Sequence, residues 1–397
     1  MENNKIELIP LGKYVKVIGG YAFKSEDFGN EGIPIIRISD FNNNTVSLEN
    51  ASLIPEDKIN KGLNYKIFSG DILIAMSGAT TGKIGIVPNN LDRTILQNQR
   101  VGKFNILETN KINREYLKFI LLSKDYQKNI TSLMAGAAQP NISSSQLESI
   151  QIPLPPLPEQ KRIAEILDKA DELRAKRKEA LAQLDSLVQS TFLEMFGDPV
   201  TNPKGWEIVK FERIGSSRLG KMLDSAKQSG KTKYPYLANF NILWGKIDIS
   251  NIRYMEFNEN ELSEFSLQYD DILICEGGEV GRTAIWKFKD SNIYFQKALH
   301  RVRLFKEIVV PEYGLYFMLF MAKNNGFKDH VTIATIAHLT GIKLKKLPIP
   351  LPPLPLQQKF ATIVESVERQ KESMRAQLQE MDILFASLQD RAFKGEL

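Results

Sequence analysis

A long internal repeat constrains the fold of this chain more than any other feature. The segment IPLPPLPEQKRIAEIL, which begins at Ile152, returns from Ile349 as IPLPPLPLQQKFATIV, 197 positions later. Upstream of each copy lies a second matched pair, GDILIAMSGATTGKIGIV from Gly70 and DDILICEGGEVGRTAIW from Asp270. A repeat of this length indicates a duplicated structural unit. We therefore expect two similar units related by a pseudo-two-fold.

The order of segments within each repeat predicts the domain organisation. IPIIRISDFNNNTV from residue 33 resembles YPYLANFNILWGKI from residue 234, so each repeat begins with a globular segment that precedes the proline stretch and a charged helical segment. Short buried strands such as ILIAM, beside helix-like segments such as EYLKFILLSKDYQKNI and EYGLYFMLFMAKNNGF, indicate an α+β fold class. The predicted division is a first domain at 1–151, a connector and helix at 152–198, a second domain at 199–348, and a second connector and helix at 349–397.

The two proline stretches, 153–158 and 350–355, are predicted to be short stiff connectors. Proline lacks an amide proton and pushes the preceding residue into extended geometry, which excludes helix and central strand. Apolar residues then recur at alternating spacings of three and four, and this heptad pattern predicts a helix of roughly 30 residues and about 45 Å in each repeat. The predicted seam positions are Ile163, Ile166, Ala170, Leu173, Arg177, Ala180, Leu184 and Leu187, and in the second copy Phe360, Ile363, Val367, Gln370, Met374, Gln377, Met381 and Leu384.

Two arrangements of these helices are open. Each helix could pack on its own globule, as amphipathic helices commonly do, or the two could pair as an antiparallel coiled coil. The matching seams favour the pair, and Gln370 and Gln377, which fall where the first helix has Leu173 and Ala180, would fix the register. Such a coil would hold two similar globules at its opposite ends.

Composition excludes several classes of function. The formal charge of +5 and the pI near 8.9 are compatible with a polyanionic partner. The single cysteine, Cys275, excludes an internal disulfide and a cysteine-rich zinc site, and His300, His330 and His338 lack a second metal ligand at useful spacing. The sequence shows neither a signal pattern nor an apolar run long enough to span a bilayer, so we expect a cytoplasmic location.

No catalytic motif in the sequence is complete. The loop SGATTGKIG is similar to a phosphate-cradling loop, but its spacing is one residue short and Ile84 stands where a magnesium-binding hydroxyl is needed. A glycine turn between strands is the favoured interpretation. Asp71 and Asp271, which precede the two apolar runs, are interpreted as turn or hydrogen-bonding residues rather than acid or base groups. Cys275 is interpreted as a core residue.

Polar loops in the first globule suggest binding to the edges of bases instead. ILQNQRVGKF and AAQPNISSSQ combine the residue types that suit this task, because arginine is bidentate to guanine and asparagine or glutamine to adenine. Such amide-rich turns are also common as plain solvated loops. Further cations are candidate phosphate contacts. The predicted DNA-binding residues are Lys24, Arg37, Ser77, Thr80, Thr81, Lys83, Gln97, Asn98, Gln99, Arg100, Gln139, Asn141, Lys221, Lys227, Lys231, Lys233, Asn239, Arg282, Lys297, His300, Arg301 and His338.

Together these motifs resemble the specificity subunit of type I restriction-modification systems over essentially the whole chain. The features that carry the resemblance are GYAFKSEDF with IPIIRISDF, GDILIAMSGATTGKIG, QPNISSSQLESIQIPLPPLPEQKRIAEIL, FLEMFGDPVTNPKGW and the second proline-plus-helix copy. IPLPPLPEQKRIAEIL is the most specific of them. The resemblance implies two target-recognition domains that each recognise one half of a bipartite site in double-stranded DNA, with two long helices between them as a spacer.

The resemblance also implies partners. Two methyltransferase subunits would dock on the long helices and modify adenine with S-adenosylmethionine, and restriction subunits that translocate and cleave DNA would join them. The chain itself would hold no cofactor and no metal, since S-adenosylmethionine, ATP and magnesium belong to the partner subunits. It is accordingly expected to be a binding protein and not an enzyme.

The second repeat departs from the first where the polar loops lie. EGGEVGR replaces SGATTGK, and TIATIAHLTG replaces GAAQPNISSS. Divergence at these places is what two different half-sites require. Two other interpretations are open: an enzyme that uses the glycine turns to bind a nucleotide, and a structural coiled-coil scaffold without sequence preference for DNA.

Overall fold

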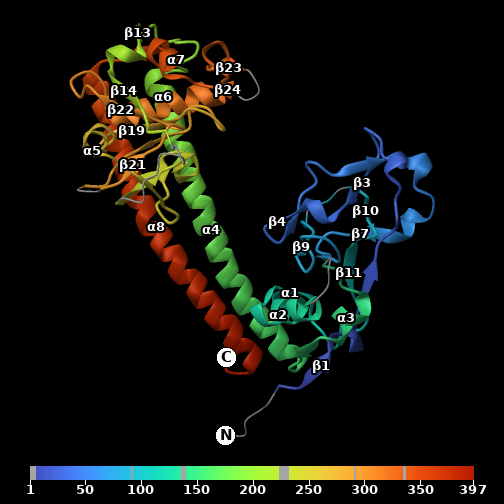
Figure 1. Ribbon diagram of the computed structural model, residues 1–397. Coiled ribbons are helices and arrows are strands. Elements are labelled where there is room, and N and C mark those ends of the chain that lie inside the picture. Colours follow the sequence, from blue (N-terminus) through green and yellow to red (C-terminus); the bar gives the residue numbers. More distant parts are fainter. Residues whose placement is uncertain are drawn as a thin grey trace. The chain divides into compact units, whose positions relative to one another are not determined.

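The chain divides into two compact units of similar construction. The computed structural model describes residues 6–89, 91, 93–135, 140–222, 232–289, 292–333 and 337–397. Unit 1 comprises Met1–Arg177 together with Gln377–Leu397, and unit 2 comprises Lys178–Ala376 (Figure 1). Each of the two longest helices therefore contributes one part to unit 1 and the other part to unit 2.

Two sheets and three helices form the globular part of unit 1. One sheet has the strand order β2-β11-β8-β9-β5-β4 and the other β6-β3-β10-β7. The strands are β2 (Val15–Gly19), β3 (Ile33–Ile36), β4 (Phe41–Asn42), β5 (Thr45–Val46), β6 (Ser52–Ile54), β7 (Lys66–Ile67), β8 (Ile72–Ala75), β9 (Ile84–Ile86), β10 (Ile95–Gln97) and β11 (Val101–Ile106). The helices are α1 (Arg114–Leu122), α2 (Lys124–Leu133) and α3 (Ser144–Ser149).

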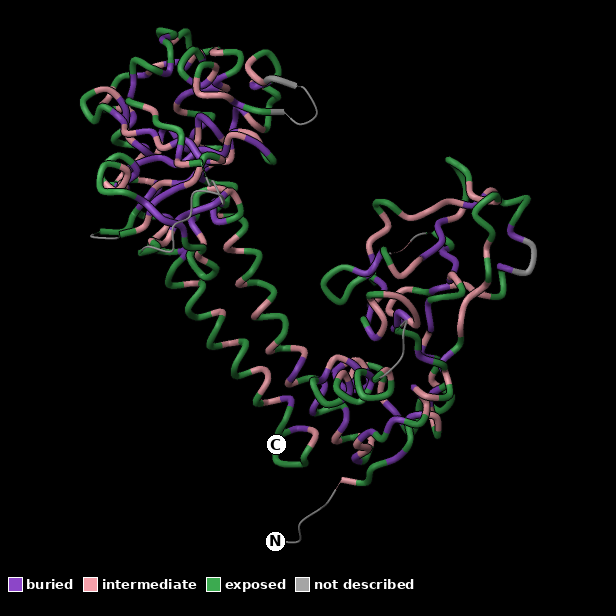
Figure 2. Tube along the Cα trace, in the orientation of Figure 1, coloured by how far each residue is buried: buried purple, intermediate pink, exposed green. Residues whose placement is uncertain are grey.

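Strand β8 shows why the apolar run ILIA forms the centre of unit 1. All four of its residues are buried, and buried residues run through the inside of each unit (Figure 2). Because side chains alternate across a strand, Ile72 and Ile74 join the core beneath the helices, whereas Leu73 and Ala75 join the core on the other face. A strand that is buried on both faces has a continuous apolar sequence. The apolar run therefore correctly predicted a buried strand.

Unit 2 repeats this construction. Its two larger sheets have the orders β14-β22-β19-β20 and β18-β15-β21, while β16 with β17 and β23 with β24 form two-stranded sheets. Strand β19 is likewise fully buried. The strands are β14 (Gly215–Leu219), β15 (Lys233–Leu237), β16 (Ile242–Leu243), β17 (Lys246–Ile247), β18 (Arg253–Glu256), β19 (Ile272–Cys275), β20 (Thr283–Ile285), β21 (Tyr294–Phe295), β22 (Leu299–Leu304), β23 (Thr332–Ile333) and β24 (Ala337–His338). The helices are α5 (Glu259–Glu264), α6 (Pro311–Lys323) and α7 (Gly341–Lys346).

The proline stretches are not simple connectors. Their first residues form edge strands, β12 (Gln151–Pro153) paired with β1 (Leu8–Pro10) and β25 (Pro348–Leu351) paired with β13 (Glu207–Lys210). Their last prolines lie in the first turn of the long helices. Proline, which has no amide proton, is tolerated in the edge strands because each of these sheets has only two strands. It is tolerated in the first turn of a helix because the amides there have no partner within the helix.

The long helices are longer than the heptad pattern indicated. Helix α4 (Leu157–Phe196) has 40 residues and α8 (Leu354–Lys394) has 41, which corresponds to roughly 60 Å each. They begin inside the proline stretches and continue past the last predicted seam residues. Short 3₁₀ turns complete the chain at Leu11–Lys13, Ser25–Asp27, Ile38–Asp40, Glu56–Lys58, Asn60–Tyr65, Phe211–Arg213, Asn239–Asn241 and Lys328–His330.

The two long helices run antiparallel, as the matching seams predicted. Within unit 1, Arg174 of α4 binds Asp382 of α8 at 2.7 Å. Within unit 2, Asp185, further along α4, binds Lys371, which lies earlier in α8, at 2.5 Å. The helices also pack on their globules, since Leu167 joins the core of unit 1 and Phe360 joins that of unit 2. Both proposed arrangements therefore occur together.

Part of the predicted seam is displaced by one residue. Positions Ala170, Leu184, Val367 and Met381 face inward as expected, but Leu173, Leu187 and Leu384 are exposed at 57%, 50% and 58%. Their places are taken by the next residues along the chain, Arg174, Val188 and Phe385. The prediction that Gln370 and Gln377 fix the register was wrong, because both side chains are exposed. Charged residues, Arg174 and Lys371, are the polar members of the seam.

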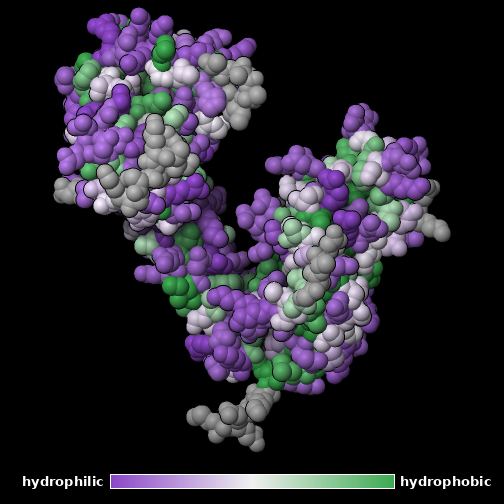
Figure 3. Space-filling model, viewed as in Figure 1, coloured by the Kyte–Doolittle hydropathy of each residue, from purple (hydrophilic) through white to green (hydrophobic). Residues whose placement is uncertain are grey.

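The two helix-like segments of the globules differ in one respect. The segment of unit 2 forms the single helix α6, whereas that of unit 1 breaks at Ser123, whose hydroxyl caps α2 by accepting from the amide of Tyr126. Among the residues that the structure describes, no helix is long and apolar enough to cross a bilayer. On the face shown in Figure 3, hydrophilic residues predominate and hydrophobic ones form small scattered areas.

Candidate nucleic-acid interface

Three polar segments that are distant in sequence meet at one end of β8 in unit 1. They are the glycine loop after β8, the turn between β10 and β11, and the residues before α3. The amide of Met76 donates to the carbonyl of Arg100 at 2.9 Å, and the amide of Gly78 donates to the carbonyl of Pro140 at 3.0 Å. The hydroxyl of Thr81 also donates to Pro140, at 3.1 Å. Backbone hydrogen bonds thus hold the three predicted loops together.

The glycine loop is a hairpin connection and not a phosphate-binding loop. It joins β8 to the antiparallel strand β9, and no helix follows it. Gly78 and Gly82 adopt φ of +83° and +89°, a region that other residues rarely enter. A phosphate-binding loop requires a helix N-terminus directly after the glycines, so the interpretation as a turn between strands is confirmed.

Several exposed side chains surround this meeting point in unit 1. Gln99, Arg100 and Asn141 are exposed, Asn98 is half-buried, and Ser77 pairs with Asn141 in an isolated β-bridge. The Ser77 hydroxyl is buried and has no hydrogen-bond partner within the described ranges. The geometry therefore gathers donors and acceptors on a surface whose backbone is already fixed, which suits recognition of base edges.

Arg37 lies beside these loops, at the end of β3. Its amide donates to Oδ2 of Asp40 at 2.8 Å, which fixes the start of the following turn. The side chain is half-buried, and within the part of the chain that the structure describes its guanidinium has no acidic partner. A buried polar group without a partner calls for an explanation.

Two predicted residues of unit 1 make hydrogen bonds within the domain and are not part of a binding surface. Gln97 is 1% exposed and its amide donates to the carbonyls of Ile18 at 2.6 Å and Val101 at 2.7 Å. The hydroxyl of Thr81 is used within the loop. We therefore remove Gln97 and Thr81 from the candidate interface. The Thr80 hydroxyl is buried without a partner among the described residues, and Lys24 and Lys83 are exposed.

The same three segments meet in unit 2. The amide of Glu276 donates to the carbonyl of Ala298 at 2.9 Å, and the carbonyl of Glu276 accepts from the amide of Leu339 at 2.8 Å. Gly277 forms the isolated bridge with His338, which corresponds to the bridge between Ser77 and Asn141 in unit 1. The backbone arrangement is thus shared, while the side chains differ.

Two predicted residues of β22 are occupied inside unit 2. His300 is 1% exposed, and its Nε2 lies 2.9 Å from the carbonyl oxygen of Leu339. Burial lowers the pKa of His300 below its ordinary value, so the ring is held neutral. Arg301 donates to the carbonyls of Glu264 and Ser266. His300 and Arg301 are therefore structural, and we remove them from the interface.

Three further predicted residues of unit 2 are held by internal contacts. Lys221 binds Glu261 at 2.5 Å. Arg282 binds Glu279 at 3.1 Å and donates to the carbonyl of Asn239 at 2.9 Å. The Asn239 amide donates to the carbonyl of Gly277. These side chains are not free to contact phosphate, because each is neutralised or hydrogen-bonded within the unit.

The remaining candidates in unit 2 are exposed. Lys297 lies in the turn before β22, His338 lies in β24, and Lys233 begins β15. Three predicted residues, Gln139, Lys227 and Lys231, lie outside the residues that the structure describes.

Glu276 is a candidate that sequence reasoning missed. This half-buried residue lies at the centre of the three segments in unit 2, and a carboxylate accepts from the amino group of cytosine. The alignment of GDILIAM with DDILICE places it opposite Met76, and that difference within a matched strand is the signal that could have identified it.

The groups considered for catalysis have structural roles. Asp271 is 1% exposed and binds the guanidinium of Arg303 through both oxygens at 2.8 Å, while Asp71 accepts from the amide of Phe68 and pairs with Lys103. Both match the interpretation as hydrogen-bonding residues. Cys275 is fully buried, and burial raises the pKa of its thiol to about 11.

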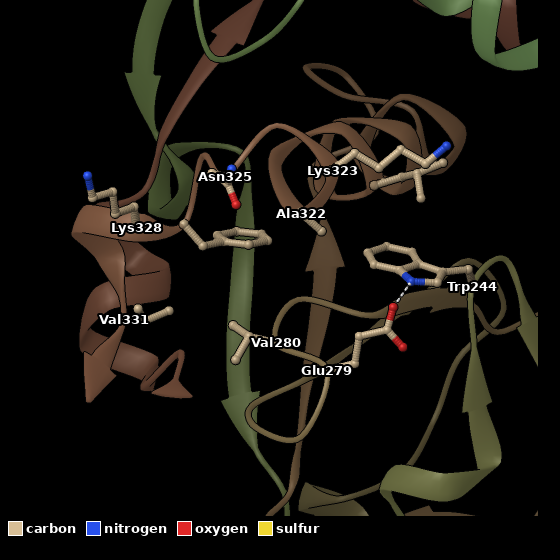
Figure 4. Close-up of a pocket in the computed structure, with 10 residues that line it drawn as sticks. Trp244, Glu279, Val280, Ala322, Lys323, Asn325, Lys328 and Val331 are labelled. Atoms are coloured by element: carbon tan, nitrogen blue, oxygen red, sulfur yellow. Dashed lines mark hydrogen bonds between the residues drawn. The ribbon is translucent and has the colours of Figure 1, made fainter. Parts of the chain in front are cut away.

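A cavity lies beside the glycine loop of unit 2 (Figure 4). Its volume is about 1030 Å³, and its walls include Trp244, Val280 and Val331. The Trp244 indole donates to Glu279 at 2.5 Å, and Lys328 lies at the side of the cavity away from Trp244 in Figure 4. Among the described residues that line it, none is a serine, threonine, cysteine or histidine, so they do not form the nucleophile and adjacent base that covalent acyl transfer uses.

Comparison with known proteins decides the family. The family model for the type I restriction modification DNA specificity domain matches residues 3–183 and matches again at residues 203–381. The chain belongs to this family. The two matches fall one on each repeat, which confirms the duplicated organisation predicted from the sequence.

Relatives and solved structures agree with this membership. The specificity subunit of the type I restriction enzyme EcoKI from Escherichia coli strain K12 is 26% identical over 418 residues, covering 98% of this chain and 89% of that protein. The MjaVIII specificity subunit of Methanocaldococcus jannaschii is 33% identical over 193 residues, covering 47% of this chain and 45% of that protein. The crystal structure of the type I S subunit from M. genitalium superposes with a TM-score of 0.54 at 17% identity, covering 99% and 98% of the two chains. This last likeness shows a shared fold.

Proposed function

We propose that this chain is the DNA-recognition subunit of a type I restriction-modification complex and catalyses no reaction itself. Unit 1 and unit 2 would each bind one half of a bipartite site in double-stranded DNA. S-adenosylmethionine, ATP and magnesium would be bound by methyltransferase and restriction subunits, and the whole complex would act in the cytoplasm.

One observation carries this proposal. Both units gather the same three loops at the end of a buried strand through equivalent backbone hydrogen bonds, from Met76 to Arg100 in unit 1 and from Glu276 to Ala298 in unit 2. The exposed side chains on these loops differ between the units. A constant backbone that presents different side chains is what recognition of two different half-sites requires.

Helices α4 and α8 are proposed to act as the spacer and as the docking surface for two methyltransferase subunits. Ion pairs join the two helices along their seam. Leu173, Leu187 and Ile383 remain exposed at 57%, 50% and 65% on these helices, which supports a role in contacting partner subunits. Two weak contacts tied to a spacer bind cooperatively only when the half-site spacing fits.

Selection from random DNA tests the proposal. The chain is assembled with its candidate methyltransferase and incubated with a library of random duplexes, and the retained duplexes are sequenced. We expect two short conserved blocks separated by a gap of fixed length. Retained duplexes without any conserved block would contradict the proposal and would favour the scaffold interpretation.

A further inference from the structure

We propose that Arg37 recognises a guanine in the half-site bound by unit 1. This inference rests on the proposed function and adds the identity of one base and of the residue that contacts it. It follows from the position of Arg37, from the state of its guanidinium, and from the contrast with the equivalent place in unit 2.

Arg37 lies where the loops of unit 1 meet. The residue before it, Ile36, accepts a hydrogen bond at its carbonyl from the amide of Asn98 at 3.1 Å. The residue after it, Ile38, touches the glycine loop, since a Cβ placed on Gly78 would lie 3.5 Å from Cδ1 of Ile38. Arg37 therefore lies between the turn that carries Asn98 and Gln99 and the glycine loop.

The guanidinium of Arg37 is buried at Nε and open at its tip. Nε is buried and, among the residues that the structure describes, has no hydrogen-bond partner, whereas the terminal nitrogens are not among the buried unpaired atoms. Partial burial restricts the rotamers of the side chain before any ligand arrives, which reduces the entropy lost on binding. A fork held in this way suits the O6 and N7 acceptors of guanine in the major groove.

Unit 2 shows that the fold does not need an arginine at this place. Ala238 occupies the equivalent position, because its amide donates to Oδ1 of Asn241 at 2.8 Å as that of Arg37 donates to Asp40. The nearby guanidinium of Arg282 is held by Glu279 and by the carbonyl of Asn239. The charge of Arg282 in unit 2 is thus paired with Glu279, whereas Arg37 in unit 1 has no acidic partner in the described ranges.

The matched control is Arg114. This exposed arginine begins α1, and its Nη1 lies 3.0 Å from a Cβ placed on Gly70. Gly70 precedes β8, whereas the recognition loops follow it. A change of Arg114 to lysine therefore alters the same residue type in the same unit, at the opposite end of the central strand.

The experiment combines variants of the full chain, assembled with its methyltransferase, with modified DNA. We expect the wild type to select guanine at one position of one half-site, and Arg37→Lys, with Arg37→Gln as a second variant, to reduce that preference by about tenfold or more. Arg114→Lys is expected to leave it unchanged. Replacing that guanine by 7-deazaguanine, which lacks the N7 acceptor, should weaken wild-type binding but should not weaken binding of Arg37→Gln further, because lysine could still contact N7 and glutamine is suited to adenine.

The outcomes separate this inference from the proposed function. Preserved guanine selection in both Arg37 variants, or equal weakening of wild type and Arg37→Gln by 7-deazaguanine, would overturn the assignment. A wild-type motif whose half-sites contain no guanine affected by either test would overturn it as well. If the wild type selects no two-block motif at all, the proposed function itself fails.

Discussion

Gln160 and Gln357 make the same three hydrogen bonds in the first turns of α4 and α8. The side chain of Gln160 accepts from the amide of Asn113 and donates to the carbonyls of Lys111 and Pro155. That of Gln357 accepts from the amide of Val310 and donates to two carbonyls placed in the same way. Both glutamines are fully buried, so each ties the start of a long helix to the loop before a shorter one.

Loss of either glutamine should therefore destabilise its unit. Each of Gln160→Ala and Gln357→Ala leaves one amide and two carbonyls without their partner, and one of these carbonyls, that of Pro155 or Pro352, lies in a buried hydrogen bond. We expect each change to lower the free energy of unfolding by about 2–3 kcal/mol. Urea titration of the full chain measures this change. Gln183→Ala, at an exposed position of α4, serves as the control. Equal stabilities for all three variants would contradict the role of these glutamines.

Removing Lys371 from the seam of the helix pair and removing its acidic partners should have different effects on stability. The Lys371 side chain is only 7% exposed and binds both Asp185 and Glu368 at 2.5 Å. Lys371→Met replaces the ammonium by an apolar chain, so we expect a change of stability within about 1 kcal/mol. Removing both carboxylates with Asp185→Asn and Glu368→Gln leaves the ammonium unpaired and should cost about 3 kcal/mol. Thermal melting compares the variants, and the reverse order of stabilities would refute this account of the seam.

His300 predicts a loss of stability in acid. Burial is the largest influence on its pKa and lowers it, while the Leu339 carbonyl and Glu276 act in the opposite direction. Because the folded chain disfavours the protonated ring, the unfolded chain binds more protons, and stability falls as the pH drops through the ordinary value of 6.5. Unfolding measured between about pH 7.5 and 5.5 should show this fall. His300→Gln should reduce it, whereas the exposed His338→Gln should not.

Arg100 is expected to contact phosphate rather than a base. Its side chain is exposed on the turn before β11 and has no ion-pair partner among the described residues. Arg100→Gln should weaken binding to all DNA sequences alike and lower the slope of log affinity against log salt by about one. Fluorescence anisotropy across a salt series measures the slope. A changed base preference with an unchanged slope would instead place Arg100 on a base edge.

The repeat and the buried strands could be predicted from sequence, whereas the helix seam could be predicted only in part. Spacings of three and four fit either Leu187 or Val188 as an inward position, since both are apolar. The packing of Val188 against the core of unit 2 selects between them. Local periodicity carries no information about that tertiary contact. The pattern alone therefore placed part of the seam one residue too early.

For the candidate site too, the sequence predicted the segments but not which of their side chains are exposed. The sequence identified the three segments that meet, because their residue types suit base edges. It did not separate Gln97, which is buried, from Gln99, which is exposed two residues later. The side of a strand or turn on which a side chain lies depends on strand register, and the partners of Gln97 come from strands distant in the sequence.

The central claim is that two different DNA half-sites are recognised by one chain, and sequencing of methylated adenines tests it most directly. DNA is compared from cells that carry this chain with its candidate methyltransferase and from cells that carry the methyltransferase alone. We predict a gapped, two-part motif with methylated adenine that appears only when this chain is present. An assembled complex that adds no such motif to the DNA would contradict the account.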